Sequence, residues 1–319
     1  MPLDTRIAGL LKIIESAGYP PMTESTPEQA REGMRALMSL VDPSTKAAVA
    51  SAEDGEIANG IPVRVYRPEA GGPDTSDTVP TVVYLHGGGF VIGDIDTHDG
   101  ICRLLCRDVN AVVVSVDYRL APEHHFPAAV QDAYAALQYV AEHLDEYGGD
   151  AAKLAIGGDS AGGNLSAVCA QLAREDGLAL AAQLLVYPAV DMFGDYPSRE
   201  ENAIGYFLTL DDMHWFAEHY LGMKEDDPKA RELEFEPRLS PLHAKSLEGL
   251  PPAVVVTAEY DPLRDEGNRY AAELEKAGVH VVHRQFPSLI HGFYGLEWVS
   301  PAIAEATAWT NAAFKELLS

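Results

Sequence analysis

Short apolar runs alternate with helical patterns along most of the chain. Seven runs rich in β-branched residues predict strands, at 63–66, 81–85, 111–116, 154–156, 183–187, 253–257 and 279–282. Apolar residues at helical spacing predict helices between most of these strands, at 99–109, 127–143, 161–175 and 262–277. Because strands that are apolar throughout are buried on both faces, the alternation predicts an α/β fold with a mostly parallel sheet covered by helices.

Two regions depart from this alternation, one before the first strand and one between two later strands. Residues 4–17 and 27–40 precede the first strand and carry helical patterns, and a capping box at Thr26 and Gln29 begins the second. The long stretch between the strands at 183–187 and 253–257 is acidic and aromatic. Long insertions at one point of a regular fold are usually functional lids, and an ornamental helical insert is the alternative.

These departures suggest a division of the chain into a core and a cap. We expect cap helices at 1–45, a cap insertion at 191–245, and a catalytic domain made of 46–190 and 246–319. The glycine-containing stretch at 71–76 is expected to be a loop.

The charge balance narrows the classes of partner. The 319 residues include 23 basic and 49 acidic side chains, a net charge of −26. Such a chain repels phosphate backbones and anionic lipid head groups, so we expect neither nucleic-acid nor membrane partners. No apolar run approaches the roughly 18 residues of a membrane span.

The number and spacing of the cysteines indicate the cellular compartment. Cys102, Cys106 and Cys169 are odd in number, and their spacing fits neither a disulfide framework nor a zinc ribbon. The first residues also lack the basic n-region of a signal peptide. We therefore expect a cytoplasmic location.

The first candidate for chemistry is a serine between a strand and a helix. The sequence Gly-Asp-Ser-Ala-Gly at 158–162 follows the strand at 154–156 and leads into the helix at 161–175. Small residues permit a sharp strand-to-helix turn from which the hydroxyl of Ser160 projects, as a nucleophile requires. The alternative is a glycine-rich turn with an incidental serine.

A second motif predicts a site for negative charge. The sequence His-Gly-Gly-Gly-Phe at 86–90 follows the strand at 81–85. Consecutive glycines allow main-chain N–H groups to converge, so Gly88 and Gly89, with Ala161 at the start of the next helix, are candidates for an oxyanion hole. A phosphate-binding loop is excluded, since no Gly-Lys-Ser/Thr follows and the spacing does not fit G-x-G-x-x-G.

We expect the base and the acid at the carboxyl ends of strands, where the catalytic groups of α/β sheets lie. His291 lies between the last strand and the terminal helix, and Asp261 follows the strand at 253–257. The alternative for Asp261 is that it only caps the following helix. The fallback acids are Glu259, Asp265 and Glu266.

Four other histidines are weaker candidates for the base than His291. We expect His280 and His283 to lie in the last strand as sheet residues. His124 and His125 are adjacent, but no matching ligands accompany them, so no metal site is expected.

Five motifs together resemble the hormone-sensitive-lipase-like esterases, bacterial family IV, from about residue 45 to the end of the chain. They lie at 86–90, 118–123, 158–163, 261–266 and 291–293. The resemblance implies an α/β-hydrolase fold, with an eight-stranded, mostly parallel sheet flanked by helices and a helical cap. The order Ser160, Asp261, His291 along the chain is also that of α/β hydrolases.

The resemblance implies hydrolysis of short- to medium-chain carboxylic esters through a Ser-His-Asp triad and an acyl-enzyme, without a cofactor. We expect Phe90, Tyr206, Phe207 and Ile290 to line the substrate pocket, and a core role is the alternative for the aromatic residues. Rival functions are a same-fold amidase, peptidase or acyltransferase, and a non-catalytic module that binds a small ligand. The edge of the last strand is expected to pair with a second copy of the chain.

Overall fold

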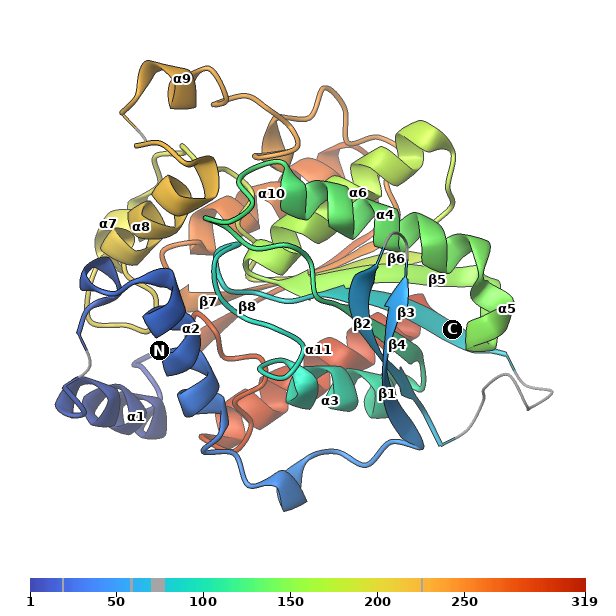
Figure 1. Ribbon diagram of the computed structural model, residues 1–319, viewed down its shortest axis with the longest axis horizontal. Helices are drawn as coiled ribbons and strands as arrows, with labels where there is room; N and C mark the ends of the chain where they lie inside the picture. Colours follow the sequence, from blue (N-terminus) through green and yellow to red (C-terminus); the bar gives the residue numbers. More distant parts are fainter. Residues whose placement is uncertain (19, 58–59, 70–77, 225) are drawn as a thin grey trace.

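The computed structural model describes residues 1–18, 20–57, 60–69, 78–224 and 226–319 (Figure 1). The loop expected at 71–76 lies outside these residues. Within them the chain forms one eight-stranded sheet with helices on both faces, which confirms the predicted fold class.

The sheet is mostly parallel. Its strands are β1 Ser51–Ile57, β2 Ile61–Arg67, β3 Val79–Leu85, β4 Val112–Val116, β5 Gly149–Asp159, β6 Ala182–Val186, β7 Ala253–Tyr260 and β8 Val281–Ile290. They are arranged in the order β1-β2-β4-β3-β5-β6-β7-β8. The β1–β2 and β2–β4 pairs are antiparallel and all the other pairs are parallel. Buried positions on the parallel strands face helices on both sides, which is why these strands read as continuous apolar runs.

All seven predicted strands are present, and β1 was not predicted. Its sequence Ser-Ala-Glu-Asp-Gly-Glu-Ile has no apolar alternation because β1 is an edge strand whose middle residues are exposed. The last strand also differs from the prediction, since β8 begins at Val281 and continues to Ile290. His283 lies in β8, whereas His280 precedes it, contrary to expectation.

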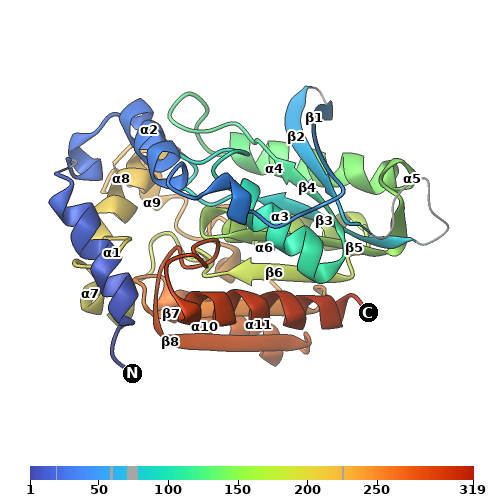
Figure 2. The same cartoon turned by 90° about the horizontal axis from the view of Figure 1, so that it is seen from below.

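The helices cover the two faces of the sheet unequally. They are α1 Thr5–Ser16, α2 Pro27–Met38, α3 Asp99–Val109, α4 Ala128–Glu142, α5 Leu144–Tyr147, α6 Ala161–Asp176, α7 Pro197–Glu201, α8 Leu210–Leu221, α9 Pro228–Arg231, α10 Arg264–Lys276 and α11 Pro301–Leu317, with short 3-10 turns η1 Met22–Glu24, η2 Pro43–Thr45 and η3 Pro241–His243. Helices α3 and α11 lie on one face, and α4, α6 and α10 on the other (Figures 1 and 2).

Neighbouring residues of a strand contribute to opposite sides of the sheet. Val82 of β3 packs in the cluster that contains residues of α3 and α11, and Val83 packs in the cluster that contains residues of α4 and α6. This alternation follows from the period of two in a β-strand. The sheet is therefore buried on both faces and provides a rigid base for the loops at its carboxyl edge.

Segments from two distant parts of the chain lie beyond the carboxyl ends of the parallel strands. Helices α1 and α2 lie at the same end of the molecule as α7 and α8 of the insertion (Figures 1 and 2). The predicted capping box begins α2: Thr26 Oγ1 accepts from the N–H of Gln29, and Gln29 Oε1 accepts from the N–H of Thr26.

One arginine of α2 joins the N-terminal segment to the core. Arg31 donates to the carbonyl oxygens of Val91 and Ala121, at 2.8 Å each, and forms a two-pronged ion pair with Glu123. These partners lie in the loops that follow β3 and β4. The Arg31 hydrogen bond to Glu123 lowers the pKa of that carboxyl to about 2.

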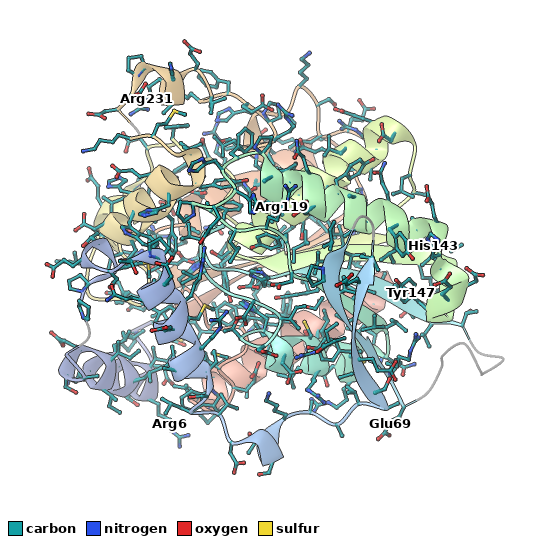
Figure 3. The ribbon with its side chains drawn as sticks, viewed as in Figure 1. Arg6, Glu69, Arg119, His143, Tyr147 and Arg231 are labelled. Carbon is teal, nitrogen blue, oxygen red and sulfur yellow. The ribbon has the colours of Figure 1, made fainter. Side chains whose placement is uncertain are left out.

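The loop that carries Glu123 is held to the core at its other end. Arg119, labelled in Figure 3 beside α4, donates to both carboxylate oxygens of Asp132, at 2.7 Å each. The main-chain N–H of Arg119 also donates to Asp132. Two-pronged pairs of this kind fix orientation as well as distance.

Candidate active site

Ser160 occupies the sharp turn between β5 and α6. Its backbone has φ of 54° and ψ of −118°, a left-handed conformation that costs free energy in any residue except glycine. A side chain at Gly158 would collide with the carbonyl oxygen of Leu85, and one at Gly162 would collide with the same carbonyl group. Glycine is therefore required on both sides of the serine, as the motif predicts, because the strand, the helix and the neighbouring strand meet there.

The structure brings the three distant candidates together. His291 Nε2 lies 3.0 Å from Ser160 Oγ, and His291 Nδ1 lies 2.8 Å from Asp261 Oδ2. Ser160 follows β5, Asp261 follows β7 and His291 follows β8, so three strand ends supply the groups. The arrangement has the hydrogen-bond order needed to move a proton from the serine hydroxyl to the imidazole.

Asp261 makes a second contact in the turn before helix α10. It is fully buried, and its second oxygen, Oδ1, accepts from the main-chain N–H of Leu263 at 2.8 Å. Helix α10 begins one residue later, at Arg264. One carboxylate oxygen faces the imidazole and the other holds the turn that leads into the helix. The N-cap residue of α10 is Leu263 and no side chain caps the helix, so the capping alternative does not describe Asp261.

The fallback acids have other partners. Glu266 accepts from the N–H of Val190 and pairs with Arg199, Asp265 pairs with Arg264, and Glu259 accepts from Gln285. Asp261 is the acid that meets His291 among the residues described.

The glycine loop after β3 has the conformation expected of a converging set of donors. Gly88 has φ of 118° and Gly89 has φ of 58°, values that glycine adopts without strain. The carbonyl oxygen of Gly88 accepts from the N–H groups of Val91 and Ile92, which tightens the loop. Within the described parts of the chain no acceptor takes the N–H of Gly88 or Gly89. Ala161 begins α6, where an N–H has no partner within the helix.

A buried carboxylate joins the glycine loop to the serine turn. Asp159 Oδ1 accepts from the hydroxyl of Tyr84 at 2.8 Å and from the N–H of Gly87 at 3.0 Å, and His98 Nε2 lies 3.6 Å away. Burial opposes ionisation of Asp159, but His98 and the hydrogen bond from Tyr84 outweigh burial and hold its pKa below the usual value. This contact was not predicted, although Asp159 lies within the serine motif.

The histidine of the glycine motif is a structural group. Burial, followed by the proximity of His98, lowers the pKa of His86 to about 4, so His86 is neutral at pH 7. Its ring stacks on Tyr118 with centroids 4.3 Å apart, and the hydroxyl of Tyr118 donates to the His86 carbonyl oxygen at 2.7 Å. These contacts anchor the first residue of the motif.

A cavity of about 1610 Å³ opens above Ser160 and His291. Three of the predicted pocket residues line it, namely Phe90, Tyr206 and Phe207. The prediction for Ile290 is wrong: it is fully buried in the hydrophobic core, and the described residues that line the cavity do not include it. Ile290 is the last residue of β8, and its side chain packs in the core. The next residue, His291, faces the cavity.

Other walls of this cavity were not predicted from the sequence. Phe216 of α8 and residues of α1 and α2 line it. Apolar residues at helical spacing are equally typical of a buried helix face, and so their pattern could not place them in a cavity.

The described residues contain no group of three or more His, Cys, Asp or Glu side chains that could hold a metal ion. His125 packs against Gly222. None of the described helices has both the length and the apolar character needed to cross a membrane. The three thiols are free and buried, and burial raises the pKa of Cys106 to about 12. The cytoplasmic location stays a prediction.

Comparisons with known proteins agree with the fold. A family model described as "alpha/beta hydrolase fold" matches residues 82–295. The carboxylic ester hydrolase LipN of Mycobacterium tuberculosis is 47% identical over 82% of this chain and 68% of its own length. The carboxylesterase NlhH of the same organism is 46% identical over 81% of this chain and 79% of its own.

A solved structure is similar over the whole length. The hyperthermophilic esterase from the archaeon Pyrobaculum calidifontis is 40% identical, with a TM-score of 0.91 and coverage of 100% of both chains. The resemblance to hormone-sensitive-lipase-like esterases is thus confirmed, and the chain belongs to the α/β-hydrolase family.

Proposed function

We propose that this carboxylic ester hydrolase cleaves short- to medium-chain esters through Ser160, His291 and Asp261. The similar proteins named as carboxylesterases support hydrolysis of an ester. The observation that carries the proposal is the 3.0 Å approach of Ser160 Oγ to His291 Nε2 at the floor of the large cavity.

The reaction begins with attack of Ser160 Oγ on the ester carbonyl carbon. His291 Nε2 accepts the hydroxyl proton, while Asp261 Oδ2 accepts from Nδ1–H and so holds the tautomer in which Nε2 is free. Asp261 also stabilises the imidazolium that forms. The imidazolium then donates its proton to the leaving alcohol oxygen, and the carbonyl group remains bonded to Ser160 as an acyl-enzyme.

The second half repeats these steps with water as the nucleophile. His291 takes a proton from water, the resulting hydroxide attacks the acyl carbon, and the serine oxygen leaves with the proton from the imidazolium. In both halves the carbonyl oxygen becomes negative, and the N–H groups of Gly88, Gly89 and Ala161 donate to it. The removal of one such donor typically costs about 3–4 kcal/mol of transition-state stabilisation.

Paired substrates test the reaction class. We expect a series of activated esters with linear acyl chains to be hydrolysed, and the corresponding anilides to release no measurable amine. An anilide needs stronger protonation of its leaving group than an activated ester. Comparable turnover of esters and anilides would favour an amidase. Faster product formation when an alcohol is added would favour an acyltransferase. Binding of the ester without turnover would favour a binding module.

We also propose that 1–45 and 191–245 form a cap over the catalytic domain. Both segments contribute walls to the cavity above Ser160, and Arg31 fixes the first segment to the core. Arg31→Ala should therefore increase protease cleavage within 1–45 relative to cleavage of the core. Arg6→Ala, at an exposed arginine of α1, is the matched control. Equal resistance of the Arg31 variant and the wild type would contradict this anchoring.

A homodimer through the sheet edge is the remaining proposal about partners. The β8 strand pairs with β7 and ends the sheet, so its other edge is where a second copy would pair. Pairing would have to leave out Ser288, whose carbonyl oxygen already accepts from the N–H of Asp4 at 3.0 Å. Light scattering at micromolar concentration should give twice the mass of one chain, with slow amide exchange along β8. A monomer under these conditions, or a dimer with unprotected β8 amides, would refute pairing by this edge.

A further inference from the structure

We propose that two phenylalanines of the insertion, Phe207 and Phe216, set separate limits on the two halves of the ester. Phe207 limits branching in the alcohol, and Phe216 limits branching next to the carbonyl carbon in the acyl group. The substrate class is therefore esters of primary alcohols with acyl groups unbranched at that carbon. The inference rests on the proposed ester hydrolysis and specifies the substrates of the same site.

Phe216 lies directly against the glycine loop. A Cβ atom built on Gly89 would overlap the Phe216 ring, whose Cγ, Cδ1 and Cδ2 are its nearest neighbours. The ring thus occupies the space that a side chain at Gly89 would fill, beside one of the N–H groups proposed to hold the carbonyl oxygen. Phe216 is half-buried, and Trp215 packs edge-on against it with centroids 5.3 Å apart.

Phe207 lies against the residue that follows the catalytic histidine candidate, as Phe216 lies against the glycine loop. A Cβ atom built on Gly292 would lie 3.1 Å from Cδ1 and Cε1 of the Phe207 ring. Gly292 directly follows His291 and has φ of 75°, which a side chain would strain. Phe207 is 38% exposed, so its ring stands at the open part of the cavity beside the base.

The chemistry determines which half of the ester meets each ring. The leaving oxygen must come within hydrogen-bond reach of His291 Nε2, so the alcohol extends on the side of His291 and Phe207. The carbonyl oxygen must point to the N–H groups of Gly88 and Gly89. The acyl chain then leaves the carbonyl carbon away from the histidine, on the side where Phe216 covers Gly89.

A branched acyl group or a branched alcohol adds volume next to one of the two rings. A methyl group on the acyl carbon next to the carbonyl projects toward Phe216, and a methyl group on the alcohol carbon projects toward Phe207. Each ring lies against the main chain of a glycine, Phe216 at Gly89 and Phe207 at Gly292, which limits its movement away from an added methyl group. A methyl group that does not fit therefore costs free energy in the transition state.

Four esters, whose hydrolysis is followed by a colour change, separate the acyl preference from the alcohol preference. The first has a linear acyl group and a primary alcohol, the second an α-branched acyl group and a primary alcohol, and the third a linear acyl group and a secondary alcohol. The fourth has both the α-branched acyl group and the secondary alcohol. We expect Phe216→Ala to raise kcat/KM for branched relative to linear acyl groups by about 10-fold or more, with the alcohol preference unchanged. Phe207→Ala should shift the alcohol preference by a similar factor and leave the acyl preference unchanged. Phe235→Ala, at an insertion phenylalanine that is 67% exposed, is the matched control and should shift neither.

Conservative variants guard against a loss of structure. Phe216→Leu and Phe207→Leu keep an apolar contact with the glycine while removing the ring, and we expect smaller shifts in the same directions. If both phenylalanine variants change both preferences alike, or change neither while the enzyme stays folded and active, the inference is wrong. Absence of turnover of all four esters by the wild-type protein would instead overturn the proposed function.

Discussion

Replacement of Ser160 by alanine should abolish ester turnover, with a fall in kcat of about 10⁶-fold. The hydroxyl is the atom proposed to form the acyl-enzyme, and its hydrogen-bond partner in the site is His291 Nε2, 3.0 Å away. Alanine carries the same Cβ atom as serine, so the turn at φ of 54° is no more strained in the variant. The melting temperature should therefore stay close to that of the wild type while the chemistry is lost.

A serine outside the site provides the comparison. Ser166 lies in the same helix, is fully buried and donates to the carbonyl oxygen of Gly162 at 2.7 Å. Ser166→Ala removes a buried hydroxyl without removing the nucleophile, so turnover should persist. Near-normal ester hydrolysis by Ser160→Ala, measured above the uncatalysed rate in the same buffer, would refute the mechanism.

Asp261→Asn should lower kcat by about 10⁴-fold with little change in melting temperature. The two carboxylate oxygens have different partners: Oδ1 accepts from the N–H of Leu263 and Oδ2 faces His291 Nδ1. An asparagine retains one acceptor, which can keep the helix start intact. Its amide group then donates toward Nδ1, which favours the tautomer with the proton on Nε2 and prevents His291 from accepting the serine proton.

Glu259→Gln is the matched control for this change. Glu259 lies two residues before Asp261, and its carboxylate contacts Gln285 and Arg264 rather than His291. We expect near wild-type kcat in this variant. A large fall in the melting temperature of Asp261→Asn, with a loss of activity explained by the unfolded fraction, would assign Asp261 a structural role in the turn before α10 alone.

The arrangement of the site was predictable because local chemistry and topology agree in this chain. Gly158 and Gly162 are required by close backbone approach, so the serine motif carries structural information as well as chemical information. Asp261 and His291 follow strands of a parallel sheet, whose carboxyl ends gather at one edge. Residues separated by long stretches of sequence could therefore be assigned to one site.

The parts that were not predicted depend on long-range packing. The edge strand β1 is exposed along its middle and pairs on one side, so it lacks an apolar pattern. Ile290 and His291 are neighbours in sequence, yet one side chain enters the core and the other faces the cavity. Phe216 contacts Gly89 only because α8 of the insertion folds over the glycine loop. The residues near Phe216 in the sequence therefore do not predict its contact with Gly89.

The most direct test of the central claim is the mass of the intact protein after treatment with an organophosphate that labels activated serines. We expect one adduct per chain on the wild type, located in the peptide that contains Ser160, and no adduct on Ser160→Ala. His291→Ala should react far more slowly, because the hydroxyl then lacks the base that accepts its proton. Turnover of esters by a protein that remains unlabelled, or an adduct at a different serine, would contradict the account.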